Sequence, residues 1–188
     1  MTTKPWIKTP LIFVIAMWAV YLIDLVIPFD FNRLGIKPRD VNGLIGVLTS
    51  PFLHGGLGHL ISNTIPAAVL LGLTTAFHNK RAPIIVPFII LIGGLVTWTI
   101  GGAGYHVGAS GLIYGLAAFL ITSGILSRRL LELFISLFVA LLYGIPMIWG
   151  MLPIHHKISW EGHVSGAAAG IWIAFLVKDY VKKQGPSS

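Results

Sequence analysis

The sequence predicts an all-α membrane protein, built as a bundle of six transmembrane helices. Of the 188 residues, 55% are hydrophobic and only 10% are charged, and the mean hydropathy of +0.85 is far above that of a soluble domain. The apolar residues form long blocks rather than heptads. The absence of cysteine excludes disulfides, thiolate metal sites and a Cys nucleophile. This composition argues against a water-soluble enzyme.

Six apolar blocks are the predicted spans, and most are close to the roughly 20 residues that a spanning helix needs. In chain order they are residues 11–27, 59–77, 82–100, 110–126, 130–152 and 162–177. The first block is interpreted as a span rather than a signal peptide, because no small-x-small cleavage site follows it. The segment between the first two blocks is too long for a simple turn, so we expect a structured outer loop. We expect one domain over residues 1–188, with a short cytoplasmic N-terminal segment (1–9) and a C-terminal tail (179–188).

The net charge of +7 is explained by membrane topology rather than by nucleic-acid binding, because the basic residues lie at the ends of the apolar blocks. With both termini in the cytoplasm, nine basic residues lie inside and four outside, as the positive-inside rule requires. The nine are Lys4, Lys8, Lys80, Arg81, Arg128, Arg129, Lys178, Lys182 and Lys183, and the four are Arg33, Lys37, Arg39 and Lys157. The sequence therefore predicts a multi-pass protein of a cell membrane, the plasma membrane of a bacterium, in contact with the lipid bilayer.

Four polar residues inside the blocks are predicted to share one layer of the membrane. Counted from the cytoplasmic basic residues at about 1.5 Å per residue, Ser110 lies roughly 27 Å up, His163 roughly 22 Å, Asn63 roughly 25 Å and His59 roughly 31 Å. In a hydrocarbon core of about 30 Å, this layer is the outer third. Polar groups inside a membrane are costly, and they are candidates for function.

The residue types in this layer indicate nucleophilic catalysis. A serine hydroxyl needs a base, and His163 is the ionisable side chain of the sixth block that could take the Ser110 proton. Ser110 also opens a predicted helix after a glycine-rich stretch, so its backbone N–H is free at the positive end of the helix dipole. His59 and Asn63 are four residues apart on one helical face, and both could donate to a developing oxyanion.

Small residues beside the two reactive side chains predict close approach of the helices that carry them. The two small-xxx-small faces are Gly111 with Gly115, and Gly166 with Gly170. Taken alone, either pair could serve bundle packing only. Tyr114, one turn from Ser110, could stack on the His163 ring and fix its orientation.

Three motifs together resemble the rhomboid family of intramembrane serine proteases. They are His59-xxx-Asn63 on the second span, Gly108-Ala109-Ser110-Gly111 with Tyr114 at the fourth, and Gly162-His163 followed by Gly166 and Gly170 on the sixth. The resemblance implies a rhomboid-like fold and a dyad of Ser110 and His163. It also implies an oxyanion hole from the Ser110 amide, His59 and Asn63, and Tyr114 stacked on His163. The expected reaction is cleavage of transmembrane protein substrates near the outer membrane face, without metal or cofactor.

The sequence also departs from the family pattern. Many relatives carry a Trp-Arg pair in the first outer loop, whereas here no Trp occurs between Trp18 and Trp98, so the anchoring of that loop is open. Glu161 is two residues from His163 and would face elsewhere on a helix, which favours a dyad over a triad. His54 is interpreted as structural.

Two other functions remain as alternatives. A metal-ion transporter could use the seven histidines, but no Asp or Glu lies in the predicted layer to neutralise a cation. A catalytically inactive rhomboid-like protein could bind membrane clients. Loss of the serine or the histidine would mark that alternative, and both are present. The oligomeric state is left open.

Overall fold

The computed structural model describes residues 5–154 and 159–183, and these residues form seven α-helices, three short 3-10 helices and no strand. The predicted all-α fold class is therefore confirmed. In chain order the elements are α1 (Pro5–Asp24), η1 (Phe31–Leu34), η2 (Val41–Ile45), α2 (Gly46–Thr49), η3 (Ser50–Phe52), α3 (Leu57–Phe77), α4 (Ala82–Ile100), α5 (Ser110–Ser127), α6 (Leu130–Gly150) and α7 (Trp160–Lys183).

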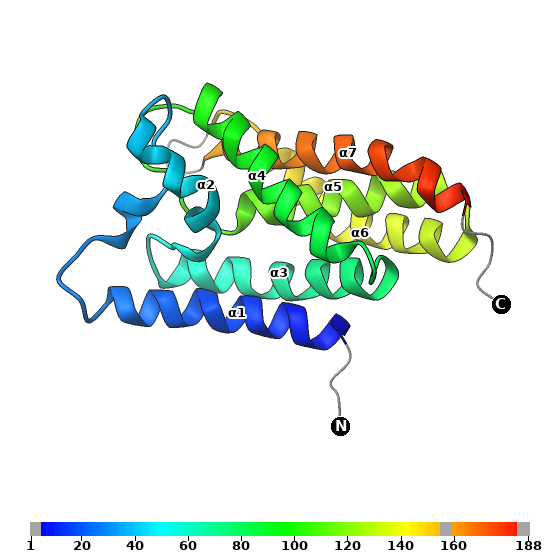
Figure 1. The fold of residues 1–188 in the computed structure, drawn as a ribbon, viewed down its shortest axis with the longest axis horizontal. Coiled ribbons are helices and arrows are strands. Elements are labelled where there is room, and N and C mark those ends of the chain that lie inside the picture. The colour runs from blue at the N-terminus through cyan, green and yellow to red at the C-terminus, as the bar shows by residue number, and fades with distance from the viewer. Residues whose placement is uncertain (1–4, 155–158, 184–188) are drawn as a thin grey trace.

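The six long helices, α1 and α3 to α7, lie side by side as a bundle (Figure 1). Helix α5 is central: α3, α4, α6 and α7 all pack against it, and α1 packs on α3. In α5, 61% of the apolar stretch is buried, against 17% in α6 and 11% in α1. The described start of α1 and end of α7 lie at one end of the bundle, and η1, η2 and α2 lie at the other (Figure 1). We call the end that carries η1, η2 and α2 the loop end.

Five of the long helices, α1 and α3 to α6, are long and apolar enough to cross a membrane. The described residues of α7 are not among them; Glu161 and His163, near the start of this helix, lower their mean hydropathy. It is nevertheless 24 residues long and runs beside α5 (Figure 1). The protein is thus a multi-pass helical membrane protein.

The predicted boundaries agree best where proline or glycine limits a helix. Helix α4 has the predicted bounds of 82–100, with Pro83 in its first turn and Gly101 at its C-cap. Helix α1 differs most, because it starts at Pro5 and ends at Asp24, whereas the apolar block predicted residues 11–27. The described part of the helix therefore begins before the hydrophobic run does. Helix α7 likewise extends beyond the predicted 162–177 at both ends.

Helices α5 and α7 pack through glycines at backbone distance. A Cβ atom on Gly166 would lie 2.0 Å from the carbonyl oxygen of Gly111, and one on Gly170 would lie 1.9 Å from that of Gly115. Real side chains do not reach such distances, so these positions accept only glycine without a shift of the helices. The pairs place Ser110 and His163 on two backbones that are in direct contact.

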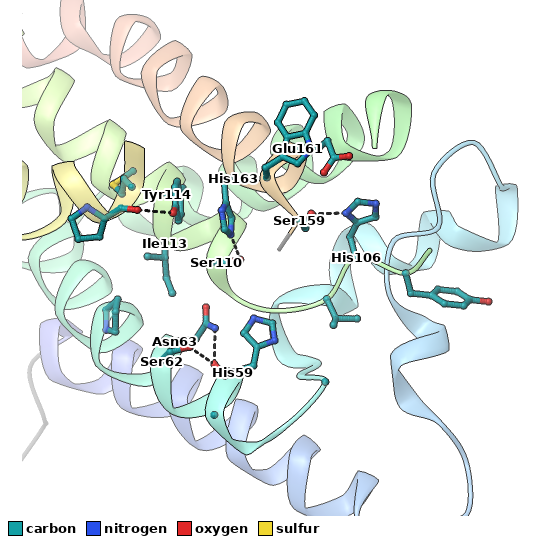
Figure 2. Close-up of a pocket in the computed structure, with 18 of the residues that line it drawn as sticks. His59, Ser62, Asn63, His106, Ser110, Ile113, Tyr114, Ser159, Glu161 and His163 are labelled. Carbon is teal, nitrogen blue, oxygen red and sulfur yellow. Dashed lines mark hydrogen bonds between the residues drawn. The ribbon is translucent and has the colours of Figure 1, made fainter. Parts of the chain in front are cut away.

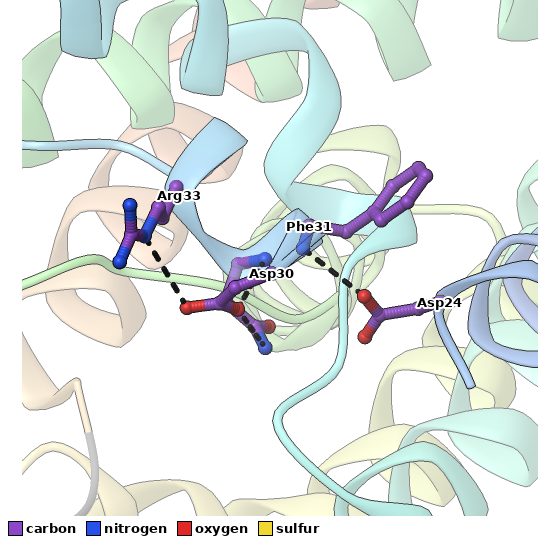
Figure 3. Close-up of polar contacts among 5 residues, drawn as sticks. Asp24, Asp30, Phe31 and Arg33 are labelled. Carbon is purple, nitrogen blue, oxygen red and sulfur yellow. Dashed lines mark hydrogen bonds and ion pairs between the residues drawn. The ribbon is translucent and has the colours of Figure 1, made fainter. Parts of the chain in front are cut away.

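The segment between α1 and α3 is structured, as predicted, and acidic side chains organise its first part (Figure 3). The Asp24 carboxylate at the end of α1 accepts a hydrogen bond from the backbone N–H of Phe31 at 3.0 Å. Asp30 caps η1 by accepting from the N–H of Asn32, and it pairs with Arg33 at 3.7 Å. Asp24 therefore fixes where the chain turns after α1.

Residues from two different segments anchor the rest of this loop. The indole N–H of Trp98, in α4, donates to the carbonyl of Asp40 at 2.8 Å. The Arg39 guanidinium donates to the carbonyl of Gly101 at 2.8 Å, and the backbones of Ile36 and His106 pair with each other. A tryptophan and an arginine thus anchor the loop although they are 59 positions apart in the sequence.

Candidate active site

A cavity of about 970 Å³ lies at the loop end of the bundle and contains the polar residues that the sequence singled out (Figure 2). Its walls come from α3, α5, α6, the start of α7 and the loop before α5. The predicted residues that line it are His59, Asn63, Ser110, Tyr114 and His163. The backbone therefore gathers side chains from three helices around one space.

Ser110 and His163 form a hydrogen-bonded pair in this cavity. The Oγ of Ser110 lies 2.9 Å from Nε2 of His163. Nδ1 of the same ring lies 2.8 Å from the carbonyl oxygen of Gly150, at the end of α6. Because a carbonyl only accepts hydrogen bonds, Nδ1 carries the proton in the neutral ring and Nε2 accepts from the Ser110 hydroxyl. This is the arrangement of a nucleophile and a general base.

A glycine with a left-handed backbone places Ser110 at the start of α5. Gly108 has φ of +112°, and its N–H donates to the carbonyl of Ser50 at 2.9 Å. A Cβ atom at this position would lie within 2.6 Å of the His59 ring. Two features therefore require glycine at this position. Its left-handed backbone disfavours a side chain, and the His59 ring leaves no space for one. Ser110 is the first residue of the helix, where backbone N–H groups have no intrahelical acceptor.

The His163 ring is held between α5 and α6. The ring of Tyr114 stacks on it with centroids 4.0 Å apart and an angle of 10° between the planes. The Tyr114 hydroxyl points toward the carbonyl of Pro146 in α6, at 3.5 Å. Stacking from one side and a hydrogen bond to Gly150 restrict the ring's rotation.

His59 and Asn63 lie on α3, across the cavity from His163 (Figure 2). The Asn63 side-chain amide donates to the carbonyl of His59 at 2.7 Å, within its own helix. An amide nitrogen carries two hydrogens, so one N–H of Asn63 remains for the cavity. The His59 ring contacts the ring of His54 at 5.1 Å between centroids, nearly edge to face.

His54 lies in the loop before α3 and is 3% exposed. Burial and, to a smaller extent, the nearby His59 lower the pKa of its imidazole to about 4, and a hydrogen bond with the Phe52 carbonyl opposes this change. Among the described residues, its Nε2 atom has no hydrogen-bond partner. A neutral His54 therefore supports the His59 ring by packing.

Sequence reasoning missed a group of contacts between the loop before α5 and the start of α7. His106 Nδ1 is hydrogen-bonded to the hydroxyl of Ser159, and the oxygen of this hydroxyl accepts from the backbone N–H of Gly162. The Glu161 carboxylate accepts from the N–H of Gly102 at 2.9 Å, so it is directed away from His163. The carbonyl of Gly150 was also missed, because every residue has a backbone carbonyl and the sequence does not show which one contacts a side chain.

The described residues contain no group of three His, Asp or Glu side chains placed to hold a metal ion. The cavity is lined by several hydroxyls, by imidazoles, by the Asn63 amide and by the Glu161 carboxylate, which accepts from Gly102. The polar groups around the Ser110 hydroxyl include the imidazoles of His59 and His163 and the amide of Asn63. These groups suit acyl transfer to a serine and stabilisation of an oxyanion.

The fold and the cavity define a helical, multi-pass membrane protein with a serine and a histidine paired between glycine-packed helices. Comparison with known families agrees: residues 41–180 match the model of the rhomboid domain. The chain belongs to the rhomboid family, and the predicted resemblance is confirmed.

The chain is also similar to uncharacterized mycobacterial proteins. It is 39% identical over 189 residues to the uncharacterized protein Rv1337 of Mycobacterium tuberculosis, covering 94% of this chain and 78% of that protein. It has the same identity and coverage with the uncharacterized protein Mb1372 of Mycobacterium bovis. It is 33% identical over 178 residues to the uncharacterized protein ML1171 of Mycobacterium leprae, covering 90% and 70%.

Proposed function

We propose that this protein is an intramembrane serine endopeptidase that cleaves the transmembrane segments of membrane-protein substrates near the outer face of the membrane. The observation that carries the proposal is the 2.9 Å contact between Ser110 Oγ and His163 Nε2 inside a cavity of a membrane helix bundle. Membership of the rhomboid family, which includes many intramembrane proteases, supports it.

In the proposed reaction, Ser110 Oγ attacks the carbonyl carbon of the scissile peptide bond while His163 Nε2 takes the hydroxyl proton. The resulting oxyanion receives hydrogen bonds from the backbone N–H of Ser110, the His59 ring and the free N–H of Asn63. The imidazolium then protonates the departing amine, which leaves an acyl-enzyme on Ser110. Water attacks the ester with His163 again as the base, and the carboxylic acid product and free Ser110 are released.

In the proposed topology, all six long helices cross the membrane of a bacterial cell and both termini lie in the cytoplasm. The described ends of α1 and α7 at one end of the bundle support an even number of crossings (Figure 1). The loop end, with the cavity, then faces outside. A substrate would reach Ser110 through the outer part of the bilayer, so its scissile bond would lie close to the outer surface.

The experiment compares the wild-type protein with Ser110→Ala and His163→Ala in liposomes that contain a single-span model substrate. We expect the wild type to cleave the substrate and both variants to be inactive but folded, since each change removes an essential step of acyl transfer. A serine-directed phosphonate should label Ser110, as located by mass spectrometry. Cleavage by Ser110→Ala would contradict the proposal. A folded wild type that neither cleaves nor is labelled would favour the client-binding alternative.

A further inference from the structure

The proposed general base contacts a backbone carbonyl where many serine hydrolases have an acidic side chain. His163 Nδ1 donates to the carbonyl oxygen of Gly150 at 2.8 Å, and Nε2 accepts from Ser110. A base that orients a serine needs its second nitrogen held in this way, so that the lone pair points at the hydroxyl. Glu161 does not provide this contact, because its carboxylate binds the N–H of Gly102.

The Gly150 carbonyl is available because Gly150 is the last residue of α6. The last four carbonyls of an α-helix have no intrahelical donor, and they form the negative end of the helix dipole. That negative end faces Nδ1 of His163. It favours the imidazolium that forms while the ring holds the serine proton, as a carboxylate would.

Only glycine allows α6 to end in this position. A Cβ atom on Gly150 would lie 1.9 Å from the Tyr114 hydroxyl oxygen and 3.1 Å from His163 Nδ1. Any side chain here must therefore move the end of α6, the Tyr114 ring or His163 itself. Gly144, in the middle of the same helix, differs completely, because a Cβ there meets nothing within 4 Å.

We infer that Gly150 is a positioning residue for His163, whose backbone carbonyl at the C-terminus of α6 takes the place of the acidic member of a catalytic triad. The inference rests on the proposed function, because it assigns the third group of the same site. It connects the position of α6 to the orientation of the base on α7.

The kinetic test compares Gly150→Ala with the matched control Gly144→Ala. We expect Gly150→Ala to lower kcat by about 100-fold, the cost of misplacing a reacting group by about 1 Å. KM should change little, and the rate of Ser110 phosphonylation should fall in parallel with kcat. Gly144→Ala should change neither rate. Thermal unfolding in detergent checks that both variants are folded.

A second substitution tests the steric part of the argument. In the double variant Gly150→Ala with Tyr114→Phe, the atom 1.9 Å from the new methyl group is gone, and the aromatic ring remains to stack on His163. We expect this change to recover part of the lost kcat, which a general loss of stability would not predict.

The spectroscopic test is independent of cleavage. With ¹⁵N-labelled histidine, the signals missing from His163→Ala belong to His163, and at neutral pH they should show Nδ1 protonated and Nε2 unprotonated. In Gly150→Ala the two tautomers should be mixed. A wild-type ring protonated on Nε2, or a Gly150→Ala protein as fast as Gly144→Ala, would overturn the inference. A wild type with the expected tautomer and no cleavage would instead refute the proposed function alone.

Discussion

Asn63 shows how one side chain can serve both its own helix and the cavity. One amide N–H donates to the carbonyl of His59, four residues earlier, and this bond fixes the orientation of the side chain. Asn63 is 4% exposed, so little room exists for another rotamer. The direction of the second N–H is therefore fixed as well. The His59 ring lies nearby, packed against the backbone of Gly108 and the ring of His54.

At this scale we predict that His59→Ala and Asn63→Ala each reduce turnover by about 10- to 1,000-fold, because each removes a proposed donor to the oxyanion. Substrate affinity should change less, since the negative charge develops only in the transition state. The measurement is kcat and KM for a peptide or model substrate in detergent. Ser62→Ala is the control, because Ser62 also lines the cavity but its hydroxyl donates to the carbonyl of His59. Unchanged turnover in both variants would place the oxyanion donors elsewhere.

At the scale of elements, the pairing of α5 with α7 sets the distance between Ser110 and His163, the proposed nucleophile and base. Gly166 and Gly170 contact the backbone carbonyls of Gly111 and Gly115. Gly166 lies one turn from His163 on the same helix face. A change in this packing therefore moves the histidine relative to the serine.

We predict that Gly166→Val lowers the cleavage rate by about 100-fold, because the branched side chain separates helices whose backbones are in contact. Stability should fall by roughly 1–3 kcal/mol, as in an overpacked core. Ala168→Val is the matched control, since Ala168 is exposed on another part of the α7 surface. Thermal unfolding in detergent and cleavage rates for both variants provide the comparison. Equal effects at the two positions would mean that Gly166 has no special part in the packing.

The helices were largely predictable from the sequence because long apolar blocks and their flanking residues reflect local chemistry. The bounds of α4 are the predicted ones, and α3 and α5 differ from prediction by one or two residues. Five of the residues that line the cavity were singled out from the sequence: His59, Asn63, Ser110, Tyr114 and His163. The contacts of Gly150, and the anchoring of the loop between α1 and α3 by Trp98 and Arg39, were not predictable. They depend on backbone carbonyls from distant segments. Because every residue carries a carbonyl, the amino-acid sequence does not show which one makes the contact.

At the scale of the whole molecule, a buried histidine at the opposite end from the cavity affects stability. His78 follows α3 directly, is 7% exposed and lies edge to face on Phe119, at 4.9 Å between centroids. Burial lowers the pKa of its imidazole to about 4; the charge of Glu132 raises it and that of Arg81 lowers it. The folded protein therefore binds this proton more weakly than the unfolded chain does.

We predict that acid destabilises the fold through His78. The ordinary pKa of 6.5 applies to the unfolded chain, so the contribution is present in full above pH 6.5 and is lost as the pH falls toward 4. The loss should be on the order of 2–3 kcal/mol. Thermal unfolding between pH 7 and 4.5 measures it. His78→Phe keeps an aromatic ring without the titration and should show a smaller drop in Tm over this range. A wild type and variant with the same pH dependence would contradict the assignment.

The contact between α5 and α7 also has a genetic consequence. A large residue at Gly166 or Gly170 collides with a peptide carbonyl, not with a side chain. No substitution at Gly111 or Gly115 removes that oxygen, so a mutant of this kind has no suppressor at the facing position. Gly150 is the opposite case, because its collision is with the hydroxyl of Tyr114, which a change to phenylalanine deletes. We therefore expect no compensating second mutation at the facing position of the α5–α7 contact. At the end of α6 we expect that a second mutation can compensate for the first.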